Sequence, residues 1–127
     1  MNSEKLELDF GTLVLHAELF VTPVAARFME HLPYEIALTQ WGNELYGPIG
    51  HDFGVYQPVP EIPAGGLAYT NRGNYLCIFF GQTPAWPVEY IGQIAGDGWK
   101  QLLEEHSLSK LSVQTEAVRK KRLPIVF

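Results

Sequence analysis

Alternation of apolar and polar positions predicts β-strands along most of the chain. Near the N-terminus Leu6, Leu8 and Phe10 alternate with charged residues, and Gly11 follows at a position typical of a two-residue hairpin turn. The same period of two recurs downstream. The strands expected from it cover residues 5–10, 13–19, 34–39, 66–70, 75–80, 88–95 and 111–117, with one more short strand within 41–50. About eight short strands therefore dominate the pattern.

Two short helices interrupt the strands. Thr22 is a hydroxyl N-cap followed by proline at the first helical position, apolar residues then recur every three or four positions, and Pro33 ends the pattern. Asp97 is expected to cap a second helix that runs toward His106. The order of elements predicts a mainly β fold: a closed or nearly closed antiparallel barrel of about eight strands with two short covering helices.

Length and charge limit the classes of function. The 127 residues fit a single domain, residues 1–127, with twelve glycines and nine prolines for its turns. A net charge of -5 argues against a nucleic-acid surface, and the basic run at 119–122 is expected to be a solvated tail. No signal peptide or membrane-spanning run is visible, so a cytoplasmic protein is expected.

Several segments, in this order, resemble the cyclophilins. Gly66–Gly73 is similar to a cyclophilin strand and turn, Cys77–Phe80 stands where cyclophilins have a strand of their proline pocket, and Tyr90–Ile94 resembles their later strand before a helix. The segments Trp41–Tyr46 and Leu76–Pro84 resemble hallmarks of a group of small prokaryotic cyclophilin-like proteins of unassigned function. The resemblance covers most of the chain and implies a cyclophilin-like β-barrel.

The catalytic residues of the prolyl isomerases have no counterpart in this sequence. Active members carry an arginine on a strand that corresponds here to Tyr34–Gly42, and this segment contains no arginine. The pocket histidine of cyclophilins aligns near Val88, so it is absent as well. The resemblance therefore implies no catalytic residues and a binding role instead of ordinary prolyl isomerisation.

The resemblance also points to a binding site. Phe79 is what remains of the apolar proline pocket, with Asn71 beside it, while Tyr69 and Tyr46 could present hydroxyl groups over an apolar floor. Arg72 lies in a turn beside this strand and could contact a carbonyl or a carboxylate. The expected ligand is a short peptide or a small, partly apolar molecule. Two simpler interpretations stay open: a solvated turn arginine, and tyrosines that only pack.

No cofactor or metal site is predicted. The histidines fall on separate elements, the glycines lack the spacing of a phosphate-binding loop, and Cys77 is expected to be a buried, inert thiol. Three alternatives to a binding module remain: a weak or atypical prolyl isomerase, an enzyme that acts on a small metabolite, and a structural subunit that meets its partner through Trp86 and the proline-rich loops.

Overall fold

The computed structural model describes residues 3–121 and contains nine strands, two α-helices and one 3-10 helix within that range. The elements follow one another in the order β1 (Glu4–Asp9), β2 (Val14–Leu19), α1 (Pro23–Glu30), β3 (Tyr34–Ala37), β4 (Thr39–Trp41), β5 (Glu44–Pro48), β6 (Gly66–Thr70), β7 (Tyr75–Phe79), β8 (Glu89–Ile94), η1 (Gly98–Leu103), β9 (Lys110–Thr115) and α2 (Glu116–Lys121).

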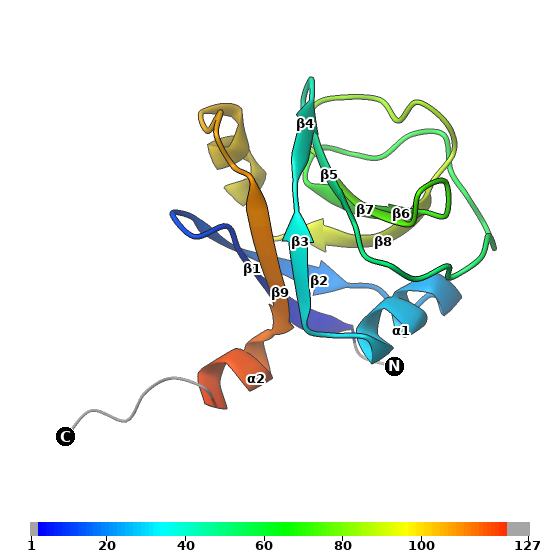
Figure 1. Ribbon diagram of the computed structural model, residues 1–127, viewed down its shortest axis with the longest axis horizontal. Helices are drawn as coiled ribbons and strands as arrows, with labels where there is room; N and C mark the ends of the chain where they lie inside the picture. The colour runs from blue at the N-terminus through cyan, green and yellow to red at the C-terminus, as the bar shows by residue number, and fades with distance from the viewer. Residues whose placement is uncertain (1–2, 122–127) are drawn as a thin grey trace.

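All the strand pairs are antiparallel, and the strands form one sheet in the order β3-β9-β1-β2-β8-β6-β7-β5-β4. The first and last strands of this sheet are consecutive in the chain, so the sheet curls into a nearly closed barrel (Figure 1). The predicted fold class is confirmed. The strand count is nine among the described residues because the expected strand 34–39 is divided at Leu38 into β3 and part of β4.

Gly47 of β5 lies where the barrel closes. A Cβ atom on this residue would lie 2.2 Å from the carbonyl oxygen of Ala37 and 2.4 Å from Cγ2 of Ile36. Only glycine allows the backbones to approach this closely. The requirement for glycine here follows from the packing of β5 against β3, since Gly47 carries no positive φ.

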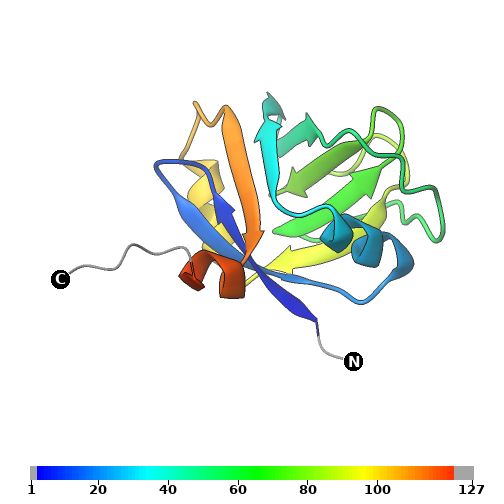
Figure 2. The ribbon, with the colours of Figure 1, turned by 60° about the horizontal axis from the view of Figure 1, so that its bottom comes forward.

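The first half of the chain follows the local signals of the sequence. The Phe10 N–H donates to the carbonyl of Leu13 at 2.8 Å across the first hairpin, where Gly11 has a φ of 95°. The hydroxyl of Thr22 accepts from the N–H of Ala25 at 3.1 Å and caps α1, as predicted. Figures 1 and 2 show α1 between β2 and β3, at one end of the barrel.

The C-terminal part differs from the prediction in two ways. The second helix is the 3-10 helix η1, which ends at Leu103, before His106, and Asp97 makes no capping hydrogen bond with its side chain. The last strand ends at Thr115 instead of residue 117 because α2 begins there, with the Thr115 hydroxyl accepting from the N–H of Val118 at 3.2 Å.

Arg119, the first residue of the basic run, lies on α2 and is exposed to solvent. Nε of Arg119 lies 3.6 Å from a carboxylate oxygen of Glu7, and its NH1 lies 3.4 Å from one of Asp9. These contacts join α2 to β1 at the surface (Figure 2). Arg122, the last residue of the run, lies outside the described residues.

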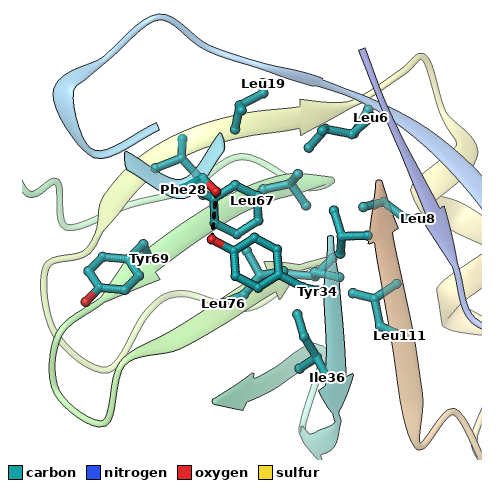
Figure 3. Close-up of a cluster of buried hydrophobic side chains, with 14 of the residues drawn as sticks. Leu6, Leu8, Leu19, Phe28, Tyr34, Ile36, Leu67, Tyr69, Leu76 and Leu111 are labelled. Atoms are coloured by element: carbon teal, nitrogen blue, oxygen red, sulfur yellow. Dashed lines mark hydrogen bonds between the residues drawn. The ribbon is translucent and has the colours of Figure 1, made fainter. Parts of the chain in front are cut away.

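The barrel interior holds the main hydrophobic core. Its buried side chains come from both halves of the sheet and from α1, as the cluster around Leu6, Leu67 and Leu111 in Figure 3 shows. The hydroxyl of Tyr34 donates to the carbonyl of Phe28 at 2.6 Å, which ties α1 to β3. Within residues 3–121 no helix has the length and hydropathy required to cross a bilayer.

Candidate binding site

The residues of β7 alternate between two hydrophobic clusters. Leu76 and Ile78 point into the barrel core, whereas Cys77 and Phe79 belong to a second, smaller cluster on the outer face of the sheet. On β5 the residues paired with this outer set are Glu44, opposite Phe79, and Tyr46, opposite Cys77. The outer face of β5 and β7 therefore carries aromatic rings, a thiol and one carboxyl group.

A pocket of about 310 Å³ opens on this outer face, and we call it the outer pocket. The strands form its floor, and the loop that leads from β7 to β8 forms the facing wall. Its lining residues are Trp41, Glu44, Tyr46, Thr70, Tyr75, Cys77, Phe79, Pro84, Ala85, Trp86 and Val88. Most of the lining is aromatic or aliphatic, so the outer pocket favours an apolar occupant.

Trp86 is held in the wall of the outer pocket by two contacts. Its indole N–H donates to the hydroxyl of Thr70 at 2.9 Å, and the guanidinium carbon of Arg72 lies 5.0 Å from the centroid of its ring. Thr70 also accepts from the backbone N–H of Arg72 at 3.1 Å. These contacts orient the half-buried Trp86 ring, the residue that the sequence offered as a contact for a partner subunit.

Glu44 is the charged residue of the outer pocket. Its side chain belongs to a residue only 7% exposed, and no described basic residue forms an ion pair with it. Burial raises the pKa of the Glu44 carboxyl, and its interaction with the Cys77 thiol offsets this only in part. A carboxyl group without a cation partner thus lies in an aromatic environment, where it can accept a hydrogen bond or exchange a proton.

Cys77 is buried beside Glu44, as expected from the apolar sequence around it. Burial, and then the neighbouring Glu44 carboxylate, raise the pKa of this thiol far above its ordinary value. The thiolate is the nucleophilic form of cysteine, so this environment suppresses the reactivity of Cys77.

The structure divides the five residues predicted to form one site between two adjoining hollows. Phe79 and Tyr46 line the outer pocket together. The Tyr69 side chain belongs to the interior cluster. Its hydroxyl accepts from the Phe53 N–H at 2.8 Å. Two acceptors lie within hydrogen-bond distance of the same hydroxyl, the His51 carbonyl at 2.8 Å and the Asn74 side-chain oxygen at 2.9 Å. The hydroxyl of Tyr69 is therefore already engaged by its own neighbours.

Asn71 and Arg72 are exposed and, together with the buried Tyr69, border a second hollow of about 220 Å³. This hollow shares Thr70, Trp86 and Val88 with the outer pocket, so the two hollows adjoin each other at Trp86. The Asn71 and Arg72 side chains thus lie next to the pocket that contains Phe79, but on the other side of Trp86.

Sequence reasoning missed Glu44 and Trp41, although both lie in the segment Trp41–Tyr46 that carried the resemblance. The available signal was strand parity. Glu44 and Tyr46 share one face of β5, and a charged residue on that face precedes the buried Leu45. Without the pairing of β5 with β7, however, the sequence does not show that this face is covered by a loop.

Within residues 3–121 no three side chains of His, Cys, Asp or Glu lie close enough together to share a metal ion.

The nearly closed antiparallel barrel defines the class of protein, and the comparison of sequences defines the family. A family model described as Cyclophilin-like matches residues 4–114, which is most of the chain. The chain therefore belongs to the cyclophilin-like family, and the resemblance to its small prokaryotic members is confirmed. No curated protein sequence matches the chain significantly.

Two solved structures share the fold. The solution structure of a hypothetical protein from Archaeoglobus fulgidus has a TM-score of 0.67 and 22% identity, and the match covers 88% of this chain and 94% of that one. The structure of McbB in complex with tryptophan has a TM-score of 0.71 and 16% identity, with 96% of this chain covered and 46% of McbB. At these identities the likeness shows the fold alone, and this chain spans about half the length of McbB.

Proposed function

We propose that this protein binds a small, partly apolar molecule in the outer pocket. The observation that carries the proposal is the outer pocket itself, a hollow of about 310 Å³ walled by aromatic and apolar side chains. Ligand pockets of about 300–1,000 Å³ with such a lining are typical sites for small molecules. The volume lies at the low end of this range, so a molecule built around one ring fits better than a large cofactor.

The wider set of predicted contacts suits a longer ligand. A short peptide would place one side chain over Phe79 and Tyr46 and continue past Trp86 toward Asn71 and Arg72.

The structure of McbB, which shares the fold, contains tryptophan, and this supports a small-molecule role for a barrel of this kind. The cytoplasmic location expected from the sequence stays a prediction.

Binding is proposed in place of prolyl isomerisation because the segment Tyr34–Gly42, which forms β3 and β4, has no arginine. An enzyme that acts on a small metabolite is the second candidate, and Glu44 favours it. A buried carboxyl group whose pKa is raised suits a general acid or base. Turnover of a ligand that binds, followed by NMR of the ligand and abolished in Glu44→Gln, would support this second candidate.

The test of binding uses 2-phenylethanol as the probe and the fluorescence of Trp41 and Trp86, which line the outer pocket, as the reporter. Ala85→Phe adds a ring at an exposed lining position and is expected to fill the outer pocket and abolish the saturable response. Ala95→Phe is the matched control, since Ala95 is exposed and lies outside the lining. No saturable response in the unmodified protein, or the same response in Ala85→Phe, would refute the proposal.

A further inference from the structure

We propose that the ligand of the outer pocket carries a primary ammonium group, which Glu44 receives, joined to an aromatic or apolar body that lies among the rings. This inference rests on the proposed function, because it names the class of ligand for the same pocket. It goes further in assigning a charge to that ligand and a partner to Glu44.

The first argument is the unpaired carboxyl group. The residue Glu44 is 7% exposed and faces Cys77 and Phe79, and no described lysine, arginine or histidine pairs with it. The Cys77 thiol donates a hydrogen bond to the Glu44 carboxyl group, but this neutral donor offsets the cost of burying a carboxylate only in part, and a cation offsets it better. In the outer pocket the ligand is the component that can supply that cation.

The second argument is the rest of the lining. Apart from Glu44 it consists of rings, small aliphatic groups, a thiol and the hydroxyl groups of Tyr46, Tyr75 and Thr70, and among the described lining residues none is basic. The Thr70 oxygen already accepts from the N–H groups of Trp86 and Arg72, so the donors left in the lining are neutral. A ligand carboxylate or phosphate would therefore find a like charge at Glu44 and no basic partner, which disfavours anions.

The third argument is the rings that surround the carboxyl group. Tyr46 and Tyr75 pack edge to face with centroids 5.2 Å apart, and Trp41 and Trp86 complete the group. Electron-rich ring faces attract ammonium groups, and Trp86 already attracts a guanidinium group, that of Arg72, on the side of the second hollow. Trp41 is 52% exposed at the rim, so a ligand has a large indole surface left to cover.

These three observations select one chemistry. The carboxyl group provides the acceptor for a charge-assisted N–H bond, and the rings provide a surface that suits both a cation and an apolar body. A primary ammonium group fits both requirements, and its N–H donors reach the carboxyl oxygens as a quaternary ammonium group could not.

The experiment compares three probes that share a phenyl ring and a two-carbon chain: 2-phenylethylamine, which carries an ammonium group at pH 7.5, the neutral 2-phenylethanol and the anionic 3-phenylpropanoate. The affinity of each is measured by fluorescence titration and calorimetry. The amine is expected to bind roughly tenfold or more tightly than the alcohol, which is the ratio that a charge-assisted hydrogen bond supplies. The anion is expected to bind most weakly.

Glu44→Gln keeps the size of the side chain and removes the charge, so it is expected to abolish the preference for the amine, measured as the ratio of the amine and alcohol affinities within that variant. The control is Glu104→Gln at an exposed position at the end of η1, which is expected to keep the preference. If Glu44→Gln fails to fold, the order of the three affinities in the unmodified protein still decides the inference.

The outcomes separate the inference from the proposed function. Equal binding of amine and alcohol, tighter binding of the anion, or an amine preference that persists in Glu44→Gln would overturn the ammonium inference, while alcohol binding that Ala85→Phe abolishes would leave the proposed function standing. Absence of saturable binding for all three probes would overturn both.

Discussion

Replacement of Tyr69 by phenylalanine tests which face of β6 the ligand uses. The Tyr69 side chain is fully buried in the barrel core, and Figure 3 shows its hydroxyl directed away from the aliphatic cluster. That hydroxyl accepts from the buried N–H of Phe53 and donates to the His51 carbonyl or to the Asn74 side chain. Tyr69→Phe removes these bonds and leaves the ring in place.

The expected loss of stability follows from the partners. The acceptor oxygens of His51 and Asn74 can accept from water instead, because His51 is exposed and Asn74 is half-buried. Phe53 is only 3% exposed, so its N–H is left without a hydrogen-bond partner. One unsatisfied buried donor together with the lost bond costs roughly 1–3 kcal/mol, and we expect about 2 kcal/mol. In a domain of this size each 1 kcal/mol lowers Tm by roughly 3–5 °C.

Urea unfolding followed by circular dichroism measures this loss, and titration with 2-phenylethanol measures binding in the same variant. The control is Tyr75→Phe, because the hydroxyl of Tyr75 forms no hydrogen bond with any described residue and the expected change is below about 0.5 kcal/mol. Tyr69→Phe should be clearly less stable and should bind the probe normally. Unchanged stability, or lost binding in a folded Tyr69→Phe, would refute the assignment of Tyr69 to the inner face.

Three further predictions concern closure, the wall of the outer pocket and the buried acid. Gly47→Ala should lower the free energy of unfolding by about 1–3 kcal/mol or more, because the added methyl group overpacks the contact between β5 and β3 where the barrel closes. Gly98→Ala is the control in the same urea experiment. Its Cβ would lie 3.5 Å from the nearest atom, so its stability should be unchanged or slightly higher. Thr70→Val removes the acceptor that orients Trp86 and should weaken 2-phenylethanol binding by roughly three- to tenfold, measured by fluorescence; unchanged affinity would contradict that role. The pKa of Glu44 is raised in the folded state, so the folded protein holds this proton more tightly than the unfolded chain does. The protein therefore loses stability as pH rises from the unfolded-state pKa of about 4.3 through the folded-state pKa. Glu44→Gln has no such proton and abolishes this loss. The stability of Glu44→Gln relative to the unmodified protein should therefore increase with pH in thermal melts, and a difference that stays constant with pH would contradict the burial of Glu44 as an acid.

Much of the fold could be predicted because local signals and tertiary structure agree. The alternation around Leu6 and Leu8, and the Thr22 cap followed by proline, correspond to β1 and α1 in the structure. A glycine inside a strand is typical of a bulge or a close backbone approach. At Gly92 the register between β6 and β8 shifts, and a Cβ atom would lie 2.6 Å from the carbonyl oxygen of Glu18. In each case a few neighbouring residues determine the conformation.

The helix α2 was not predicted because the strand alternation before it masks its local cap, in which the Thr115 hydroxyl accepts from the N–H of Val118. The alternation from Leu111 continues as far as Ala117, so the sequence favours a longer strand. Ion pairs from Arg119 to residues on β1, more than a hundred positions earlier in the chain, also favour the helix. No local pattern contains that contact.

The candidate site was predicted in part for the same reason. Phe79 and Tyr46 were assigned to one site, and they line the outer pocket together. Tyr69 was placed beside them from its position in the sequence, but β6 pairs Tyr69 with Leu76 and thereby turns its ring to the barrel interior. Strand register, which the sequence does not specify, decides which side chains share a face.

The most direct test of the outer pocket as the binding site is a map of backbone amide chemical shifts during titration with 2-phenylethylamine. The largest changes are expected at Glu44, Cys77, Phe79 and Trp86, which line the outer pocket. Changes centred instead on Phe53 and its neighbours around the Tyr69 hydroxyl, or no saturable change at any residue, would contradict the outer pocket as the binding site.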